Sequence, residues 1–415
     1  MSKYAVVGHH YWGRPGGGEL VCAATVVALE EVGYLPVLTS PVDFDSGKYV
    51  DWFGIDLSKY PKHTWGLKLR AFGLYLRLVS WRAMSSALKK YDADLLFTDV
   101  SYVKPLSKLR FEGVKIIEYI HFPFEVSLNP KYSGLGFHYS QDPYIKERYS
   151  SFPLNLYLWS FAKFSKYFMC ENPFHCVDLV LTNSRWTARV VKEAFGENPI
   201  VLNPPIPPNV EVVGVSKPFE ERRNLIVMLG RFSEEKRYHW VVSELYPKLK
   251  NELPEVKVVI FGGAGTRTAY TYLNKLRELA EKHGVKVSND LRVDAHIYLI
   301  PDAKRETVNK AMDEAKAFLH ATINEHWGVA VAEAMARGLP VVVHKSGGAW
   351  TDLAEEGTYG LGYQTTEEAL KSLVGLFTDG NVWRHYSTKA LLRAQNLTLD
   401  KYVGNFKNAM SKLLT

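Results

Sequence analysis

The sequence of 415 residues contains few cysteines and no long apolar segment. The three cysteines, Cys22, Cys170 and Cys176, cannot all pair with one another, and so small a number is typical of a reducing compartment. No apolar run approaches the about 18 residues of a membrane-spanning helix, because residues such as Arg77 and Glu333 interrupt the most apolar stretches. The first apolar run is too short for a signal peptide and predicts a buried strand. We therefore expect a cytoplasmic protein.

The glycine-rich fingerprint of dinucleotide-binding proteins is also missing. The chain has Gly16-Gly17-Gly18 after its first predicted strand, but this is not the G-x-G-x-x-G pattern. The second predicted strand ends at Ser40 without the acidic residue that would bind a ribose. These absences count against a dinucleotide oxidoreductase, which we keep as an alternative.

Positive charge is concentrated in one segment. The chain carries a net charge of +7, and residues 59–115 hold 12 basic and 4 acidic residues, or +8. Such a segment favours an anionic partner, which could be a phosphate, a nucleic acid or an anionic membrane surface. A non-catalytic nucleic-acid binder is therefore a second alternative.

A later segment has aromatic residues at helical spacing: Tyr157, Phe161, Phe164 and Phe168. This spacing predicts a helix that faces the core. The alternative is a helix with one face in a membrane interface.

Strands and helices are expected to alternate along the chain. Apolar runs rich in β-branched residues predict strands at residues 4–8, 35–39, 94–98, 115–120, 179–182 and 200–202, and then at 225–229, 256–261, 296–300, 317–321 and 340–344. Between the two series, residues 203–224 contain five prolines, which exclude a helix or a central strand and predict a linker. The pattern predicts an α/β protein with two doubly wound parallel sheets, whose ligands bind where the strands end.

Three loops after predicted strands carry residues suited to an anionic ligand. Gly17 and Gly18 would let a backbone approach a ligand at a helix N-terminus; a tight structural turn is the alternative. His121 directly follows the strand at 115–120, and a structural histidine is the alternative there. Arg231 and Lys236 flank a turn that opens a helix, so they could clamp a diphosphate or form an ordinary solvated loop.

The most informative segment is residues 324–340. Glu325 lies in a loop after the strand at 317–321, and Glu333 lies inside a helix whose residues 329–336 are otherwise apolar. A carboxylate in such surroundings needs a partner. A pair of ligand hydroxyls or an internal arginine would serve.

This spacing resembles the E-x7-E signature of the retaining family 4 glycosyltransferases, which have the GT-B fold, and the resemblance extends over nearly the whole chain. It is closer to the branch of GDP-mannose-dependent α-1,2-mannosyltransferases that extend lipid-linked oligosaccharides. The likeness is carried by residues 319–320 together with 324–328, and by the segments 343–348, 182–187 and 203–206.

The resemblance implies roles for these residues. Glu333 would bind the ribose hydroxyls of a nucleotide, and Glu325 would lie beside the donor sugar. Arg231 and Lys236 would hold the diphosphate in place of a metal. The backbone at Gly17 and Gly18 would approach the diphosphate, and His121 would lie beside sugar and acceptor. No carboxylate pair suited to a metal is evident in the loops that should form the site, so we expect no metal and no cofactor.

The resemblance also implies a domain plan and substrates. We expect an N-terminal acceptor-binding Rossmann-like domain at 1–205, a linker at 206–223, a C-terminal nucleotide-sugar-binding Rossmann-like domain at 224–397 facing it across a cleft, and a helix at 398–415 that packs back on the first domain. The expected reaction moves a hexose, with mannose from GDP-mannose favoured, to a glycan acceptor, which we expect to be lipid-linked. UDP-glucose remains the alternative donor. The enzyme would be cytoplasmic, peripheral on an anionic membrane surface, and would bind no nucleic acid.

Overall fold

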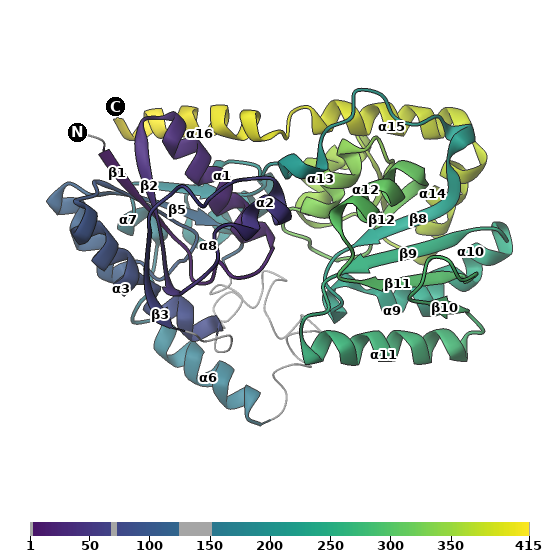
Figure 1. Ribbon diagram of the computed structural model, residues 1–415, viewed down its shortest axis with the longest axis horizontal. Coiled ribbons are helices and arrows are strands. Elements are labelled where there is room, and N and C mark those ends of the chain that lie inside the picture. The colour runs from purple at the N-terminus through teal and green to yellow at the C-terminus, as the bar shows by residue number, and fades with distance from the viewer. Residues whose placement is uncertain (1–2, 68–72, 124–151, 415) are drawn as a thin grey trace. The chain divides into compact units, whose positions relative to one another are not determined.

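The computed structural model describes residues 3–67, 73–123 and 152–414 (Figure 1). The chain divides into two compact units. The first comprises Met1–Asn209 and Leu399–Thr415, and the second comprises Val210–Thr398. Each unit is built around one sheet of seven strands. The segment expected as a linker, 206–223, spans the division between them.

The first unit contains a parallel sheet in the order β3-β2-β1-β4-β5-β6-β7. Its strands are β1 (Lys3–Gly8), β2 (Tyr34–Val42), β3 (Lys62–Leu67), β4 (Leu95–Thr98), β5 (Lys115–Ile120), β6 (Leu179–Thr182) and β7 (Ile200–Val201). From β1 the chain adds β2 and β3 on one side and then returns to add β4 on the other. The strand order therefore reverses between β1 and β4, which is where open sheets of this kind bind ligands.

Helices on the first sheet include one from the far end of the chain. The helical segments are α1 (Gly17–Glu31), α2 (Lys48–Phe53), α3 (Gly73–Tyr91), the 3₁₀ segment Lys104–Glu112, α6 (Leu154–Ser165), α7 (Pro173–Cys176), α8 (Arg185–Phe195) and α16 (Leu399–Leu414). The C-terminal helix α16 packs against α1 (Figure 1). The Thr25 and Tyr402 hydroxyls hydrogen-bond at 2.7 Å, and Phe406 contacts Phe97 in β4.

The second unit repeats the same plan. Its parallel sheet has the order β10-β11-β9-β8-β12-β13-β14. The strands are β8 (Arg223–Leu229), β9 (Lys257–Gly262), β10 (Val287–Ser288), β11 (Ile297–Pro301), β12 (Ala315–His320), β13 (Val341–His344) and β14 (Leu361–Tyr363). Here the order reverses between β8 and β12, so a ligand is expected at the carboxyl ends of these two strands.

The helices of the second unit lie between its strands or after the last one, as the alternating pattern predicts. They are α9 (Tyr238–Trp240), which continues through a π-helical turn at Val241–Leu245 into α10 (Tyr246–Glu252), then α11 (Arg267–Lys282), α12 (Arg305–Glu314), α13 (Val329–Ala336), α14 (Thr366–Thr378) and α15 (Gly380–Ala394). All six residues of β12 are buried, as expected of a central strand covered on both faces.

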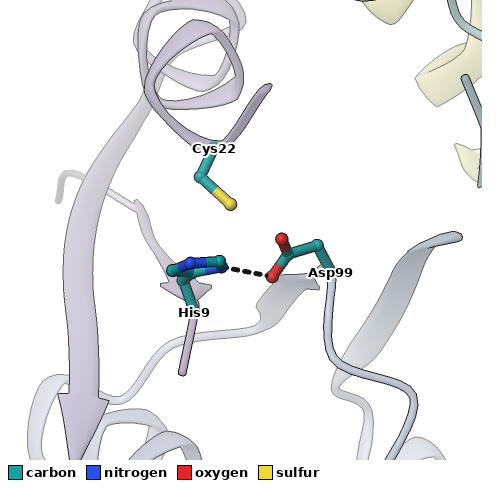
Figure 2. Close-up of side chains that lie close together, drawn as sticks. All are labelled: His9, Cys22 and Asp99. Carbon is teal, nitrogen blue, oxygen red and sulfur yellow. Dashed lines mark hydrogen bonds and ion pairs between the residues drawn. The ribbon is translucent and has the colours of Figure 1, made fainter. Parts of the chain in front are cut away.

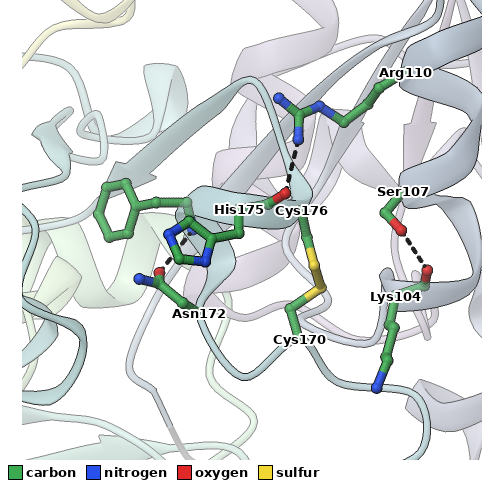
Figure 3. Close-up of a disulfide and its surroundings, with 8 residues drawn as sticks. Lys104, Ser107, Arg110, Cys170, Asn172, His175 and Cys176 are labelled. Atoms are coloured by element: carbon green, nitrogen blue, oxygen red, sulfur yellow. Dashed lines mark hydrogen bonds between the residues drawn. A yellow bond between two sulfur atoms is a disulfide. The ribbon is translucent and has the colours of Figure 1, made fainter.

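Several features differ from the expectations. The strands β3, β10 and β14 were not predicted, and all three lie at the edges of their sheets. The sequence of β3, KHTWGL, has few apolar residues, and β10 and β14 are only two and three residues long. The cysteines were expected to stay reduced, but Cys170 and Cys176 form a disulfide (Figure 3). The short helix α7, capped by the Asn172 side chain, brings their Cα atoms to 6.3 Å, within disulfide reach. Cys22 is free and buried.

Candidate active site

In the second unit, three charged or ionisable side chains meet where the strand order reverses. Lys236, after β8, donates a hydrogen bond from Nζ to Oε2 of Glu325 at 2.7 Å. The same oxygen lies 3.0 Å from Nε2 of His320, the last residue of β12. Burial alone would raise the pKa of Glu325, but the charge of Lys236 and the hydrogen bond from His320 hold it well below its usual range. The cluster therefore presents an ionised carboxylate beside an ammonium group.

The loop that carries Glu325 is held by a second loop after β13. The backbone N–H of Gly348 donates to the Glu325 carbonyl at 2.7 Å, and the backbone N–H of Asn324 donates to Oγ of Ser346 at 2.8 Å. Gly347 has φ +72°, and a Cβ there would overlap the backbone of Glu325. Glycine is thus needed for both its conformation and its size, and Glu325 is fixed by its backbone as well as its side chain.

The two cations of the expected clamp lie in different surroundings. Lys236 is in the cluster with Glu325, whereas the Arg231 side chain is 78% exposed and pairs with Glu235 at 3.3 Å. Arg237, which the sequence did not single out, has a left-handed backbone and donates from Nη1 to the carbonyl of Ala321 at 3.3 Å. The structure therefore brings one of the two expected cations to Glu325.

Glu333 lies on α13 and is paired with an arginine. Nη1 and Nη2 of Arg305, at the start of α12, donate to its two carboxylate oxygens at 2.8 and 3.3 Å. The charge of Glu333 raises the pKa of Arg305. The internal arginine considered as an alternative is thus present. Each carboxylate oxygen keeps a further lone pair, so the ion pair holds Glu333 in place without using up its capacity to accept hydrogen bonds.

In the first unit, a buried carboxylate joins two histidines where the strand order reverses. Asp99, just after β4, lies 2.7 Å from Nδ1 of His9, just after β1 (Figure 2). Its other oxygen lies 3.0 Å from Nε2 of His121, just after β5. His121 was expected from the sequence, whereas His9 and Asp99 were not. Their positions directly after strands were the available signal.

The glycine-rich turn lies against this cluster. The helix α1 begins at Gly17, and a Cβ on Gly18 would lie 3.1 Å from Oδ2 of Asp99 and 3.4 Å from Nε2 of His121. Both distances are tight, so Gly18 permits the close approach of helix and carboxylate. The glycine-rich turn therefore has a packing role in the first unit.

The residues His9, Cys22 and Asp99 are close enough together to be considered as metal ligands (Figure 2). Burial raises the pKa of the Cys22 thiol to about 12, whereas a metal ligand must be the thiolate. Nδ1 of His9 is engaged with Asp99. These donors therefore fit a hydrogen-bonded network better than a metal site.

Closely spaced aspartates occur twice in the chain, contrary to our expectation for the loop after β2. Asp43 and Asp45 follow β2, where Oδ1 of Asp45 accepts from the backbone of Gly47 at 3.0 Å and Asp43 lies 3.9 Å from Lys62. Asp94, in the pair 92–94, is ion-paired with Lys3 at the surface. Each of these three carboxylates has a protein partner, so neither pair resembles a prepared metal site.

The aromatic segment 157–168 divides between core and surface. Phe161 is fully buried, as a core-facing helix requires, but Trp159 on the same helix is 60% exposed. Leu156, Phe164 and Tyr167 are also exposed. None of the helices among the described residues is long and apolar enough to cross a membrane.

Comparisons with known proteins match both units. Residues 214–381 match the family described as glycosyl transferases group 1. The chain is 25% identical over 386 residues to the mouse GDP-Man:Man(3)GlcNAc(2)-PP-Dol alpha-1,2-mannosyltransferase, covering 83% of this chain and 73% of that protein. Among solved structures, a glycosyltransferase from Rickettsia africae has a TM-score of 0.65 at 14% identity, covering 100% of this chain and 99% of the other.

A third similar protein is HepE from Anabaena, solved with UDP and glucose, with a TM-score of 0.68 at 16% identity over 99% of this chain and 100% of the other. These matches favour a glycosyltransferase over the two alternatives, a dinucleotide oxidoreductase and a non-catalytic nucleic-acid binder. Residues 214–381, which match the glycosyl transferases group 1 family, lie in the second unit, the chain has the GT-B fold, and the protein is a glycosyltransferase.

Proposed function

We propose that this enzyme transfers mannose from GDP-mannose to a lipid-linked glycan, with retention of configuration at the anomeric carbon. The observation that carries the proposal is the similarity to an α-1,2-mannosyltransferase over 83% of the chain. That share is larger than either unit alone could supply, so both the donor-binding and the acceptor-binding halves are included.

The second unit is the proposed site of the nucleotide-sugar. Lys236, with Arg231 swinging in from the surface, neutralises the diphosphate as it leaves, which replaces a metal ion. Glu325 accepts hydrogen bonds from the hydroxyls of the donor sugar. Glu333 accepts hydrogen bonds from the ribose, held in place by Arg305 at 2.8 Å.

The first unit is the proposed site of the acceptor. The N-terminus of α1, at Gly17 and Gly18, has backbone N–H groups suited to an anionic group of a ligand. His121 contacts the reacting hydroxyl or the sugar. These assignments use side chains and backbone groups alone, and the proposal includes no metal and no cofactor.

An anionic membrane surface is the proposed location of the acceptor. Helix α6 exposes Leu156, Trp159 and Phe164, and Lys163 lies 5.1 Å from the ring of Trp159. Apolar side chains flanked by lysines suit the boundary between headgroups and acyl chains. Peripheral binding at the cytoplasmic face would place the enzyme beside a lipid-linked glycan.

The donor is tested by calorimetry with GDP, UDP and ADP, followed by transfer assays with the matching sugar nucleotides. We expect GDP to bind most tightly and GDP-mannose to be consumed. The alternative donor is UDP-glucose, favoured by the shared fold of HepE, whose structure holds UDP and glucose. Preferred binding of UDP would select that alternative and leave glycosyl transfer itself intact.

A further inference from the structure

Asp99 occupies a central place in the first unit, and the roles proposed so far do not use it. Its side chain is 4% exposed, and that of His9 is 3% exposed, whereas that of His121 is 29% exposed. The cluster therefore has a buried ion-pairing end and one imidazole that solvent, or a ligand, can reach. Such an arrangement is costly to bury unless every charge is compensated.

Each carboxylate oxygen of Asp99 lies within hydrogen-bonding distance of a histidine nitrogen. Burial alone would raise its pKa, but the charge of His9 and the hydrogen bond from His121 hold the pKa of Asp99 well below its usual range. The pKa of His9 is raised well above its usual value by Asp99, although burial opposes this. An imidazolium at His9 thus pairs with a carboxylate at Asp99.

An ionised carboxylate can only accept hydrogen bonds. The nitrogen of His121 that faces Oδ2 of Asp99 at 3.0 Å is Nε2, so Nε2 must carry the proton. In the neutral ring the lone pair then lies on Nδ1. The tautomer of His121 is therefore set by Asp99.

The position of His121 is fixed from three sides. Its backbone carbonyl accepts from Nδ2 of Asn183 at 2.7 Å, and its ring packs against Tyr119 with the centroids 4.9 Å apart. Gly18 of α1 leaves room for the contact between His121 and Asp99. The N-terminal end of α1, with its partial positive charge, lies against the carboxylate and adds to its stabilisation.

From this geometry we infer that Asp99 is a positioning residue, which locks His121 in the Nε2–H tautomer so that Nδ1 accepts a hydrogen bond from a hydroxyl of the sugar or acceptor. The inference rests on the proposed function, in which His121 contacts that hydroxyl. His9 supplies the positive charge that keeps Asp99 ionised. Asp99 acts only through His121 and touches no substrate itself.

The tautomer can be measured without any activity. ¹⁵N spectra of the imidazoles, recorded over a pH series, distinguish the two neutral tautomers, and loss of one signal in His121→Gln assigns that residue among the 13 histidines. We expect the Nε2–H form in the unmodified enzyme and a mixture in Asp99→Asn. An Nδ1–H form in the unmodified enzyme, or an unchanged tautomer in Asp99→Asn, would overturn the inference. Neither result would count against glycosyl transfer as the proposed function.

Kinetics test whether the tautomer matters. Asp99→Asn should lower kcat by about 10–100-fold, the scale at which orienting partners act, with little change in the KM for the donor. In a His121→Ala background the same substitution should have no further effect, because its route of action is gone. Additive losses would show that Asp99 acts by another route.

A matched control separates positioning from stability. Asp178→Asn removes another partly buried carboxylate of the same unit, which accepts from the backbone of Ile116 at 2.8 Å and lies 3.3 Å from Arg110. This variant should lose thermal stability and keep its kcat per folded molecule. If Asp99→Asn only lowers the melting temperature, as the control does, the positioning role is wrong. If no sugar nucleotide is turned over at all, the proposed function fails, and the tautomer result still stands.

Discussion

At the scale of single residues, the proposed site is organised around carboxylates that hold fixed partners. Glu325 binds Lys236 and His320 in one unit, and Asp99 binds two histidines in the other. Both carboxylates follow a strand at the place where the strand order of their sheet reverses. Charges arranged in advance of the reaction stabilise a leaving group without reorganisation.

The first prediction concerns the diphosphate clamp. Lys236→Ala should reduce turnover by roughly 10²–10³, the scale for losing one charge-stabilising donor, and it removes the partner of Glu325 as well. Arg231→Ala should also reduce turnover, but without disturbing Glu325, because Arg231 pairs with Glu235. Steady-state kinetics on folded variants measure both. Near-normal turnover in Lys236→Ala would remove it from the clamp.

The second prediction separates the two glutamates. Glu333→Gln should weaken binding of nucleoside diphosphate and donor alike. The contact with the ribose that it removes is the same in the ground state and the transition state. Glu325→Gln should leave nucleoside diphosphate affinity nearly intact and lower kcat. Calorimetry with GDP on both variants decides. Equal losses of affinity would show that the two residues share one task.

Arg305 offers a control for the ribose assignment. If it acts by holding Glu333 against the ribose, Arg305→Gln should weaken GDP binding more than it weakens 2′-deoxy-GDP binding. Equal weakening of both ligands would mean that the ion pair is structural and that Glu333 does not bind the ribose.

At the scale of elements, the loops after β12 and β13 are hydrogen-bonded to each other, and the titratable residue His344 lies beside them. Oγ of Ser346 accepts from the N–H of Asn324 and hydrogen-bonds with Nδ1 of His344, 2.7 Å away. Burial and the charge of Arg237 lower the pKa of His344 to about 4, against the opposing effect of Glu368.

The third prediction follows from that pKa. Between an unfolded value of about 6.5 and about 4 in the folded state, the unfolded chain binds more protons at His344 than the folded chain. The free energy of unfolding should therefore fall as the pH drops through this window. His344→Gln should flatten that slope, as followed by urea unfolding at a series of pH values. An unchanged slope would place the titrating group elsewhere.

Much of the fold could be predicted from local sequence. The strand expected at 115–120 coincides with β5, and the strand expected at 317–321 overlaps β12. The edge strand β3 was missed because a half-exposed strand has no apolar run. The pairings of Glu333 with Arg305 and of Asp99 with His9 join residues 28 and 90 positions apart, and only the fold brings them together. The disulfide was missed because its closure depends on the turn at α7.

At the scale of the whole molecule, positive charge and exposed aromatic side chains occur in the same unit. Residues 59–115 carry a net +8, and α6 exposes Trp159 and Phe164. Helix α6 contacts α3, which lies within the basic segment. Apolar insertion and electrostatic attraction can thus act on one membrane surface.

The fourth prediction is peripheral, salt-sensitive binding to anionic vesicles. The protein should sediment with vesicles containing phosphatidylserine and be released by salt, because exposed charges are screened within about 10 Å at 0.1 M. Trp159→Ser should weaken binding, while Tyr270→Ser, an exposed aromatic of the second unit, should not. Equal sedimentation with neutral vesicles would count against the electrostatic attraction.

The most direct test of the account is the product formed from GDP-mannose in the presence of EDTA. The account predicts that mannose is transferred to a lipid-linked glycan at undiminished rate, since Lys236 and Arg231 stand in for a metal. It also predicts an α-linkage, read from the one-bond carbon–proton coupling of the anomeric centre. A β-linked product, or activity lost on chelation and restored by Mg²⁺ or Mn²⁺, would contradict it.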